Sequence, residues 1–234
     1  MAGFKTHITT STAIGVVYGA GASYFGDVDP SACILAGGLC SVSGMLPDLD
    51  RDSGVPLRES IAFAASVIPM LMIPRFRTMG FSPESMVLAG GAIYLFIRFG
   101  LARLLQKYTV HRGMFHSLPA ALIEAEVAFL ICARQDLGLR YFNAGAVLLG
   151  FMSHLVLDEI WSVGLKRGRV YLKSSSGTAL KLWGDSTWGN VSAYVKVLIL
   201  SYLVLQDPVW MYQDTPPGQN LRQIATGAIE RIWK

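Results

Sequence analysis

The four histidines of this chain are the first residues whose chemistry stands out. His111 and His116 lie close together in a short polar segment, residues 111–117, between two long apolar runs. His7 precedes the first apolar run, and His154 lies near the end of a later one. Imidazoles, together with carboxylates, bind zinc, manganese and iron in proteins. The histidines are therefore the first candidates for a metal site.

Three aspartates accompany the histidines. Asp158 follows His154 by four residues in a helical run, so both side chains project from one face of that helix. Asp48 and Asp50 follow Pro47 at the end of another apolar run, where an Asp-x-Asp pair can bridge two ions or divide between binding an ion and supporting a ligand. The predicted metal ligands are His7, Asp48, Asp50, His111, His116, His154 and Asp158.

Seven ligands exceed what one ion needs, so we predict two or more divalent ions. Zn²⁺ is the first choice, with Mn²⁺ and Fe²⁺ as alternatives. Paired ions about 3.5–4 Å apart are suited to the hydrolysis of phosphate esters. Arg112 could neutralise a phosphate or a developing oxyanion; its alternative role is a solvated loop arginine that sets topology. We name Arg112 and Asp50 as candidate catalytic residues.

Each motif alone has a simpler explanation. A lone histidine at a helix end is more often an interfacial polar residue than a ligand, and Pro-Asp-x-Asp commonly ends a helix in a turn. A His-x-x-x-Asp pair also occurs by chance in many helices. The metal hypothesis therefore depends on whether the helices bring these residues together.

The composition predicts that these helices lie in a membrane. Hydrophobic residues make up 52% of the 234 residues and charged residues only 15%, whereas an ordinary soluble domain carries about 25% charge. The mean hydropathy is +0.43. Several apolar runs approach the ~20 residues that cross a bilayer as a helix. They are residues 8–25, 31–46, 60–73, 84–105, 118–133, 141–161 and 190–205.

We therefore predict an all-α, polytopic transmembrane helix bundle with a polar metal site at one membrane face. The count is six to seven spans, because the run at 60–73 is short and could be a half-crossing element. Residues 1–212 form one integral-membrane domain in this interpretation. Residues 213–234 form a polar C-terminal tail.

Alternating topology places the candidate ligands on one side of the membrane, provided that the third run crosses. The amino terminus, the loops after the second and fourth runs, and the end of the sixth run then share a face. That face has eleven Lys and Arg residues against seven on the other. Basic residues favour the cytoplasmic side, so the predicted site faces the cytoplasm.

The motifs also resemble a known family. Thr6-His7, Leu46-Pro47-Asp48-Leu49-Asp50, His111-Arg112-Gly113-x-x-His116-Ser117 and Ser153-His154-x-x-x-Asp158 resemble the YdjM-like inner-membrane metal-dependent hydrolases, some of them under SOS (LexA) control. The resemblance spans about residues 5 to 165. That family is distantly similar to zinc-dependent phospholipase C and the P1-type nucleases, all-helical enzymes with a zinc cluster.

The resemblance implies a bacterial inner-membrane protein with six metal ligands. These ligands are His7, Asp48, His111, His116, His154 and Asp158, with Asp50 less secure. The soluble relatives also use an amino-terminal tryptophan as a ligand, and the start of this chain has none. That departure puts a three-zinc arrangement in doubt.

The leading hypothesis is a membrane-embedded hydrolase that cleaves a phospholipid or a lipid-linked phosphate through a metal-activated water. The alternative is a metal-ion transporter or a metal-binding membrane protein without hydrolytic activity. Transport requires polar groups near the middle of the bilayer, where only Glu124, Glu126 and Arg98 are predicted. A structural membrane protein is the third possibility. The expected partners are the bilayer and a lipid or phosphoester substrate, with no nucleic acid.

Overall fold

Helices make up most of the chain that the structure describes. The computed structural model describes residues 3–50, 55–101, 103, 114–132, 136–166, 169–172 and 180–212. The long helices are α1 (Phe4–Gly26), α2 (Pro30–Ser43), α3 (Val55–Leu71), α5 (Pro83–Leu95), α7 (Leu118–Ile131), α8 (Leu137–Ser162) and α9 (Thr187–Leu205). Shorter elements are the 3₁₀ helices η1 (Leu46–Asp50) and η3 (Pro208–Tyr212), the helix α4 (Ile73–Thr78) and the π-helix η2 (Phe96–Leu101).

Among the described residues, five helical segments are long and apolar enough to cross a membrane. They are Pro30–Asp48, Leu57–Thr78, Pro83–Leu101, Leu137–Ser162 and Thr187–Trp210. The all-α membrane bundle predicted from the sequence is confirmed. The third run is longer than the predicted 60–73, because α4 extends α3 and together they reach a spanning length. Neither α1 nor α7 is among the five, so their crossing stays a prediction.

Most helix starts follow from local sequence signals. The Asp29 carboxylate accepts hydrogen bonds from the backbone at the start of α2, and Pro30 occupies the first helical turn. The hydroxyls of Ser82, Ser117 and Ser186 each accept a hydrogen bond from the backbone N–H of the third residue of α5, α7 and α9, respectively. Such side chains satisfy backbone N–H groups that have no partner within the helix. The cap at Ser117 matters most, because it fixes the residue next to His116.

Small residues allow α1, α2 and α8 to pack closely. Ser11, Gly15 and Gly19 recur every four residues along the buried face of α1. A Cβ atom on Gly15 would lie 2.6 Å from the Gly37 carbonyl oxygen of α2, and one on Gly150 of α8 would lie 2.0 Å from the Cys40 carbonyl oxygen. Close backbone contact through small residues is typical of helices that associate in lipid.

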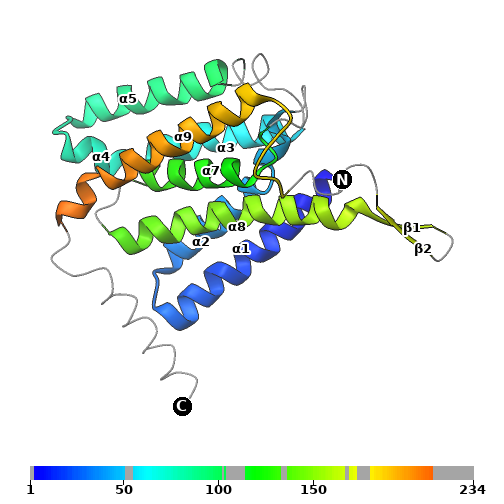
Figure 1. Ribbon diagram of the computed structural model, residues 1–234. Coiled ribbons are helices and arrows are strands. Elements are labelled where there is room, and N and C mark those ends of the chain that lie inside the picture. The colour runs from blue at the N-terminus through cyan, green and yellow to red at the C-terminus, as the bar shows by residue number, and fades with distance from the viewer. Residues whose placement is uncertain are drawn as a thin grey trace.

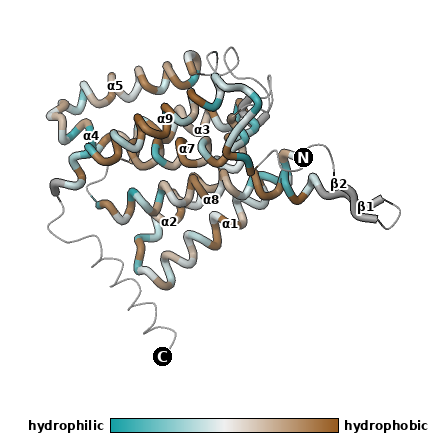
Figure 2. Tube along the Cα trace, in the orientation of Figure 1, coloured by the Kyte–Doolittle hydropathy of each residue, from teal (hydrophilic) through white to brown (hydrophobic). Residues whose placement is uncertain are grey.

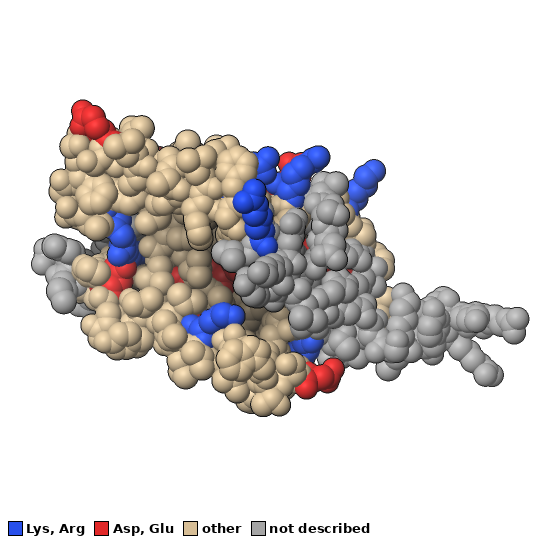
Figure 3. Space-filling model, turned by 90° about the horizontal axis from the view of Figure 1, so that it is seen from above, with Lys and Arg blue, Asp and Glu red and all other residues tan. Residues whose placement is uncertain are grey.

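The helices α5 and α9 form the outer part of the bundle. Figure 1 shows them beside α3 and α7, while α1, α2 and α8 form the other side of the molecule. Hydrophobic residues predominate along α7 and α9 (Figure 2). Large apolar side chains of α5 and α9, including Val87, Leu88, Leu198 and Leu205, are exposed. Uncharged residues cover most of the described surface seen from above in Figure 3, so these faces are suited to contact with lipid.

A β-hairpin extends α8 at one end of the bundle. Strand β1 (Val163–Lys166) pairs antiparallel with β2 (Arg169–Leu172), and Figure 1 shows the hairpin projecting away from the helices. These strands lie between the predicted runs at 141–161 and 190–205, where the sequence pattern predicted no element. The reason is that four-residue strands leave too short a pattern to recognise.

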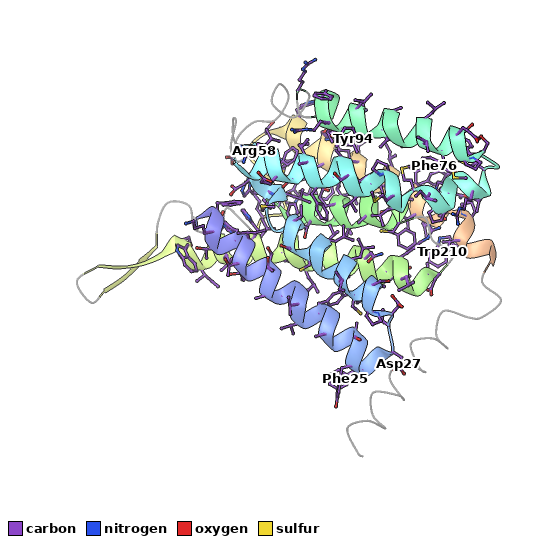
Figure 4. All side chains as sticks on the ribbon, turned by 180° about the vertical axis from the view of Figure 1, so that it is seen from behind. Phe25, Asp27, Arg58, Phe76, Tyr94 and Trp210 are labelled. Atoms are coloured by element: carbon purple, nitrogen blue, oxygen red, sulfur yellow. The ribbon has the colours of Figure 1, made fainter. Side chains whose placement is uncertain are left out.

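A buried ion network joins three elements at the other end of α8. Asp207, which follows α9, accepts from Arg75 of α4 at 2.6 Å and lies 2.9 Å from Arg140 of α8. Asp207 and Arg140 are almost fully buried. Figure 4 shows Phe76 and Trp210, neighbours of this network in sequence, at the opposite end of the bundle from Arg58.

Asp207→Asn is expected to destabilise the bundle by about 2 kcal/mol, because the variant leaves two arginines beside a neutral amide. Arg75 is about a third exposed, and solvent reduces its share of the effect. Thermal unfolding in detergent measures the change. Glu59→Gln is the control, since its pair with Arg58 is exposed and surface pairs contribute little. Equal stability of both variants would contradict the role of the network.

Candidate metal centre

Five of the seven predicted ligands lie together at one end of the bundle. His7 lies near the start of α1, Asp48 in η1 directly after α2, His116 just before α7, and His154 with Asp158 near the end of α8. All five side chains are buried. The convergence predicted from alternating topology is therefore present in the structure.

The ring of His154 is fully buried and held in one orientation. Its Nδ1 lies 2.8 Å from the carbonyl oxygen of Gly44, an acceptor, so Nδ1 carries the proton and donates. The other nitrogen, Nε2, lies 3.7 Å from the Asp158 carboxylate one turn further along α8. A histidine that donates one N–H to a carbonyl and presents the other nitrogen to a carboxylate has the arrangement of a metal ligand.

His7 completes a first group of three with these two residues. Its ring stacks on that of His154, with centroids 3.7 Å apart and planes 11° apart. Its Nε2 lies 3.3 Å from the other oxygen of Asp158. The carboxylate of Asp158 therefore faces both imidazoles.

Asp48 and His116 form a second group with His154. His116 Nε2 lies 3.8 Å from an Asp48 carboxylate oxygen, and the His116 ring meets that of His154 edge-on, with centroids 5.5 Å apart. Ser117 holds His116 in place, because its hydroxyl donates to the Met114 carbonyl and accepts from the Ala120 N–H. The hydroxyl thus closes a turn on both sides of His116.

The donor set fits a divalent cation. In each group of three, one ligand atom from every residue lies within 4.8 Å of the others. His154 Nε2 and His7 Nδ1 are buried without a hydrogen-bond partner among the described residues, and an unsatisfied buried polar atom is costly unless something binds it. With neutral imidazoles, Asp48 and Asp158 give the cluster two negative charges, which a divalent ion would balance.

The two groups share a single nitrogen atom. Because Nδ1 of His154 is engaged with Gly44, Nε2 is the atom left for an ion, and one nitrogen lone pair binds one ion. If two ions bind, only one of them takes His154. The predicted count of two or more ions stays a prediction.

The remaining predicted site residues are not placed in the cluster. His111 and Arg112 lie outside the described residues, and Asp50 ends η1 without a described side chain. Glu126, deeper in α7, accepts a hydrogen bond from Ser201 of α9. The sequence reasoning did not identify Gly44, whose contribution is a backbone carbonyl and leaves no signal in residue type.

An apolar helix bundle with a buried cluster of imidazoles and carboxylates at one end defines a polytopic membrane protein with a candidate metal centre. A sequence model of the YdjM inner membrane protein family matches residues 1–168. The match covers more than half of the chain, which belongs to this family of inner membrane proteins. The matched residues include every predicted metal ligand. Searches of curated proteins and of solved structures found no match.

Proposed function

We propose that this protein is a membrane-embedded, metal-dependent hydrolase of phosphoesters, with a phospholipid or a lipid-linked phosphate as substrate. The observation that carries the proposal is the convergence of His7, Asp48, His116, His154 and Asp158 from separate elements into one buried cluster. The proposed ion is Zn²⁺, on the chemistry of the donors. The resemblance to metal-dependent hydrolases supports the same reaction class.

The residues of the cluster would hold and orient the ion. The Asp158 carboxylate faces Nε2 of both His7 and His154, and the Gly44 carbonyl fixes the His154 ring so that its Nε2 faces the site. When bound, a divalent ion polarises a phosphoryl oxygen and makes water more acidic. Arg112, two residues before Met114 in sequence, is proposed to neutralise the phosphate, and Asp50 to assist the reaction. The proposed orientation toward the cytoplasm rests on the distribution of basic residues.

Metal transport is the second candidate, and the structure favours it less. A transport route needs polar groups near the bilayer midplane, whereas the cluster lies at one end of α8. Of the two carboxylates deeper in α7, Glu126 is hydrogen-bonded to Ser201 and so ties α7 to α9. These positions support a site at the membrane boundary.

The test is turnover of phosphoesters by the purified protein in phospholipid vesicles supplied with Zn²⁺ or Mn²⁺. We expect His116→Ala and Asp158→Ala to lower turnover by about a hundredfold or more, since loss of even a supporting group costs 10–100-fold at metal sites. Release of the phosphorylated headgroup measures the rate. Unchanged turnover in both variants would refute the proposal.

Uptake of metal ions into the same vesicles distinguishes a hydrolase from a metal transporter. A hydrolase gives no uptake that depends on Glu126, so Glu126→Gln should leave the vesicle interior free of added metal, as in the wild type. Uptake that is present in the wild type and lost in Glu126→Gln would favour a transporter.

A further inference from the structure

The segment that leads into α9, together with the first turn of that helix, carries an exposed apolar surface at the end of the bundle that holds the metal centre. We call residues 180–190 the tryptophan loop. Trp188 is 80% exposed and Trp183 is 66% exposed, and Leu180 and Leu182 are exposed beside them. Figure 1 shows this segment running from the start of α9 past the start of α7. The loop lies outside the residues matched by the family.

The tryptophan loop is held in a defined shape. The Gly184 N–H donates to Asn190 Oδ1 at 2.7 Å, and Asn190 Nδ2 donates to the Gly184 carbonyl at 2.8 Å. The Tyr194 hydroxyl donates to the Leu182 carbonyl. The Trp183 and Tyr194 rings lie 4.7 Å apart. The segment that carries the exposed indoles is therefore fixed by hydrogen bonds and by a contact between aromatic rings.

The loop also contacts the chain on both sides of His116. The Leu118 N–H donates to the Lys181 carbonyl at 3.1 Å. On the other side, a Cβ atom on Gly184 would lie 3.2 Å from Met114 Sδ, so Met114 lies against the glycine backbone. Met114 and Leu118 are each two residues from His116. The position of the tryptophan loop is thereby linked to a predicted ligand.

We propose that the tryptophan loop is a docking surface that holds one bilayer phospholipid beside His116. The candidate span Thr187–Trp210 begins within the loop, and the exposed apolar side chains continue along α9 through Val191, Val195 and Leu198. An indole prefers the membrane–water boundary, where its ring meets acyl chains and its N–H meets polar groups. The phosphate of a phospholipid lies at that boundary.

This inference rests on the proposed function, and it adds the surface by which a phospholipid reaches the site from the bilayer. Because the loop is continuous with a lipid-facing helix, a lipid held by Trp183 and Trp188 would have its headgroup near the His116 segment. A water-soluble phosphoester would gain nothing from this surface. The hydrolysis rate of a bilayer phospholipid, divided by that of a water-soluble phosphoester, therefore measures the contribution of the tryptophan loop.

The first test compares Trp188→Ser with the wild type on two substrates. One substrate is phosphatidylglycerol in mixed phosphatidylethanolamine–phosphatidylglycerol vesicles, and the other is soluble bis(p-nitrophenyl) phosphate. We expect the variant to lower the ratio of vesicle rate to soluble rate about tenfold. Phe25→Ser, at the far end of α1 (Figure 4), is the control and should leave the ratio unchanged. An unchanged ratio in Trp188→Ser would overturn the proposal.

A second test needs no turnover. Trp188 is kept as the single tryptophan by changing Trp161, Trp183, Trp210 and Trp233 to Phe, and its fluorescence is measured in vesicles with brominated phospholipids. Docking predicts stronger quenching by bromine near the headgroup than by bromine at the chain end. Emission typical of indole in water, without quenching, would overturn the docking surface. Quenching of Trp188 without turnover of either substrate would refute the hydrolase proposal and leave the docking surface supported.

Discussion

His154→Ala is expected to lower the affinity for Zn²⁺ by about a hundredfold or more and to abolish the proposed hydrolysis with it. His154 is the residue that the two groups of candidate ligands share, so its loss affects both. Its Nε2 is buried and has no hydrogen-bond partner among the described residues. Metal content per chain, measured by elemental analysis after dialysis, checks the expectation.

The matched control for His154→Ala is Ser153→Ala. Ser153 is the neighbouring residue of the same helix, it is also buried, and its hydroxyl donates only to the Gly150 carbonyl one turn earlier. We expect Ser153→Ala to keep the wild-type metal content. Equal metal content in wild type and His154→Ala would show that the imidazole is not a ligand. The number of metal ions bound per wild-type chain also distinguishes a one-ion site from a two-ion site.

Gly150→Ala is expected to destabilise the protein by about 3 kcal/mol or more, which is at or above the usual cost of overpacking a core. The added methyl group would lie 2.0 Å from both the Cys40 carbonyl oxygen and Ser43 Oγ. The Ser43 side chain can rotate, but the Cys40 carbonyl belongs to the backbone of α2. The two helices must therefore separate. Thermal unfolding in detergent, monitored by circular dichroism, measures the loss.

The same substitution is expected to weaken metal binding. Gly150 lies one turn before His154 on α8, and Gly44, which accepts the hydrogen bond from His154, directly follows α2. Moving α2 away from α8 therefore lengthens the contact that orients the imidazole. We expect metal content to fall in Gly150→Ala even in the fraction that remains folded.

Gly91→Ala is the control for the packing argument. A Cβ atom on Gly91 of α5 would meet nothing within 4 Å, and alanine favours a helix over glycine by about 1 kcal/mol. Stability should therefore stay the same or rise slightly. A loss in Gly91→Ala equal to that in Gly150→Ala would mean that helix contact at Gly150 is not the cause.

The sequence predicted the membrane helices well because their signal is local. Apolar length and sparse charge identify a spanning segment without knowledge of its neighbours, and α9 and α8 were found close to their observed bounds. The third run was predicted too short. Its continuation contains Arg75 and Arg77 of α4, which interrupt the apolar pattern. Pro69 lies inside α3, and α4, with Pro74 in its first turn, continues the same candidate span.

What the sequence by itself determined was the set of residue types and the end of the bundle at which they gather. The alternation of helices requires His7, Asp48, His116 and His154 to share one end if each predicted span crosses. Only the tertiary structure decided which atoms face one another. The stacking of His7 on His154 and the hydrogen bond from His154 to Gly44 depend on how closely α1, α2 and α8 approach. That approach is set by backbone contacts between small residues distant in sequence, which no local pattern encodes.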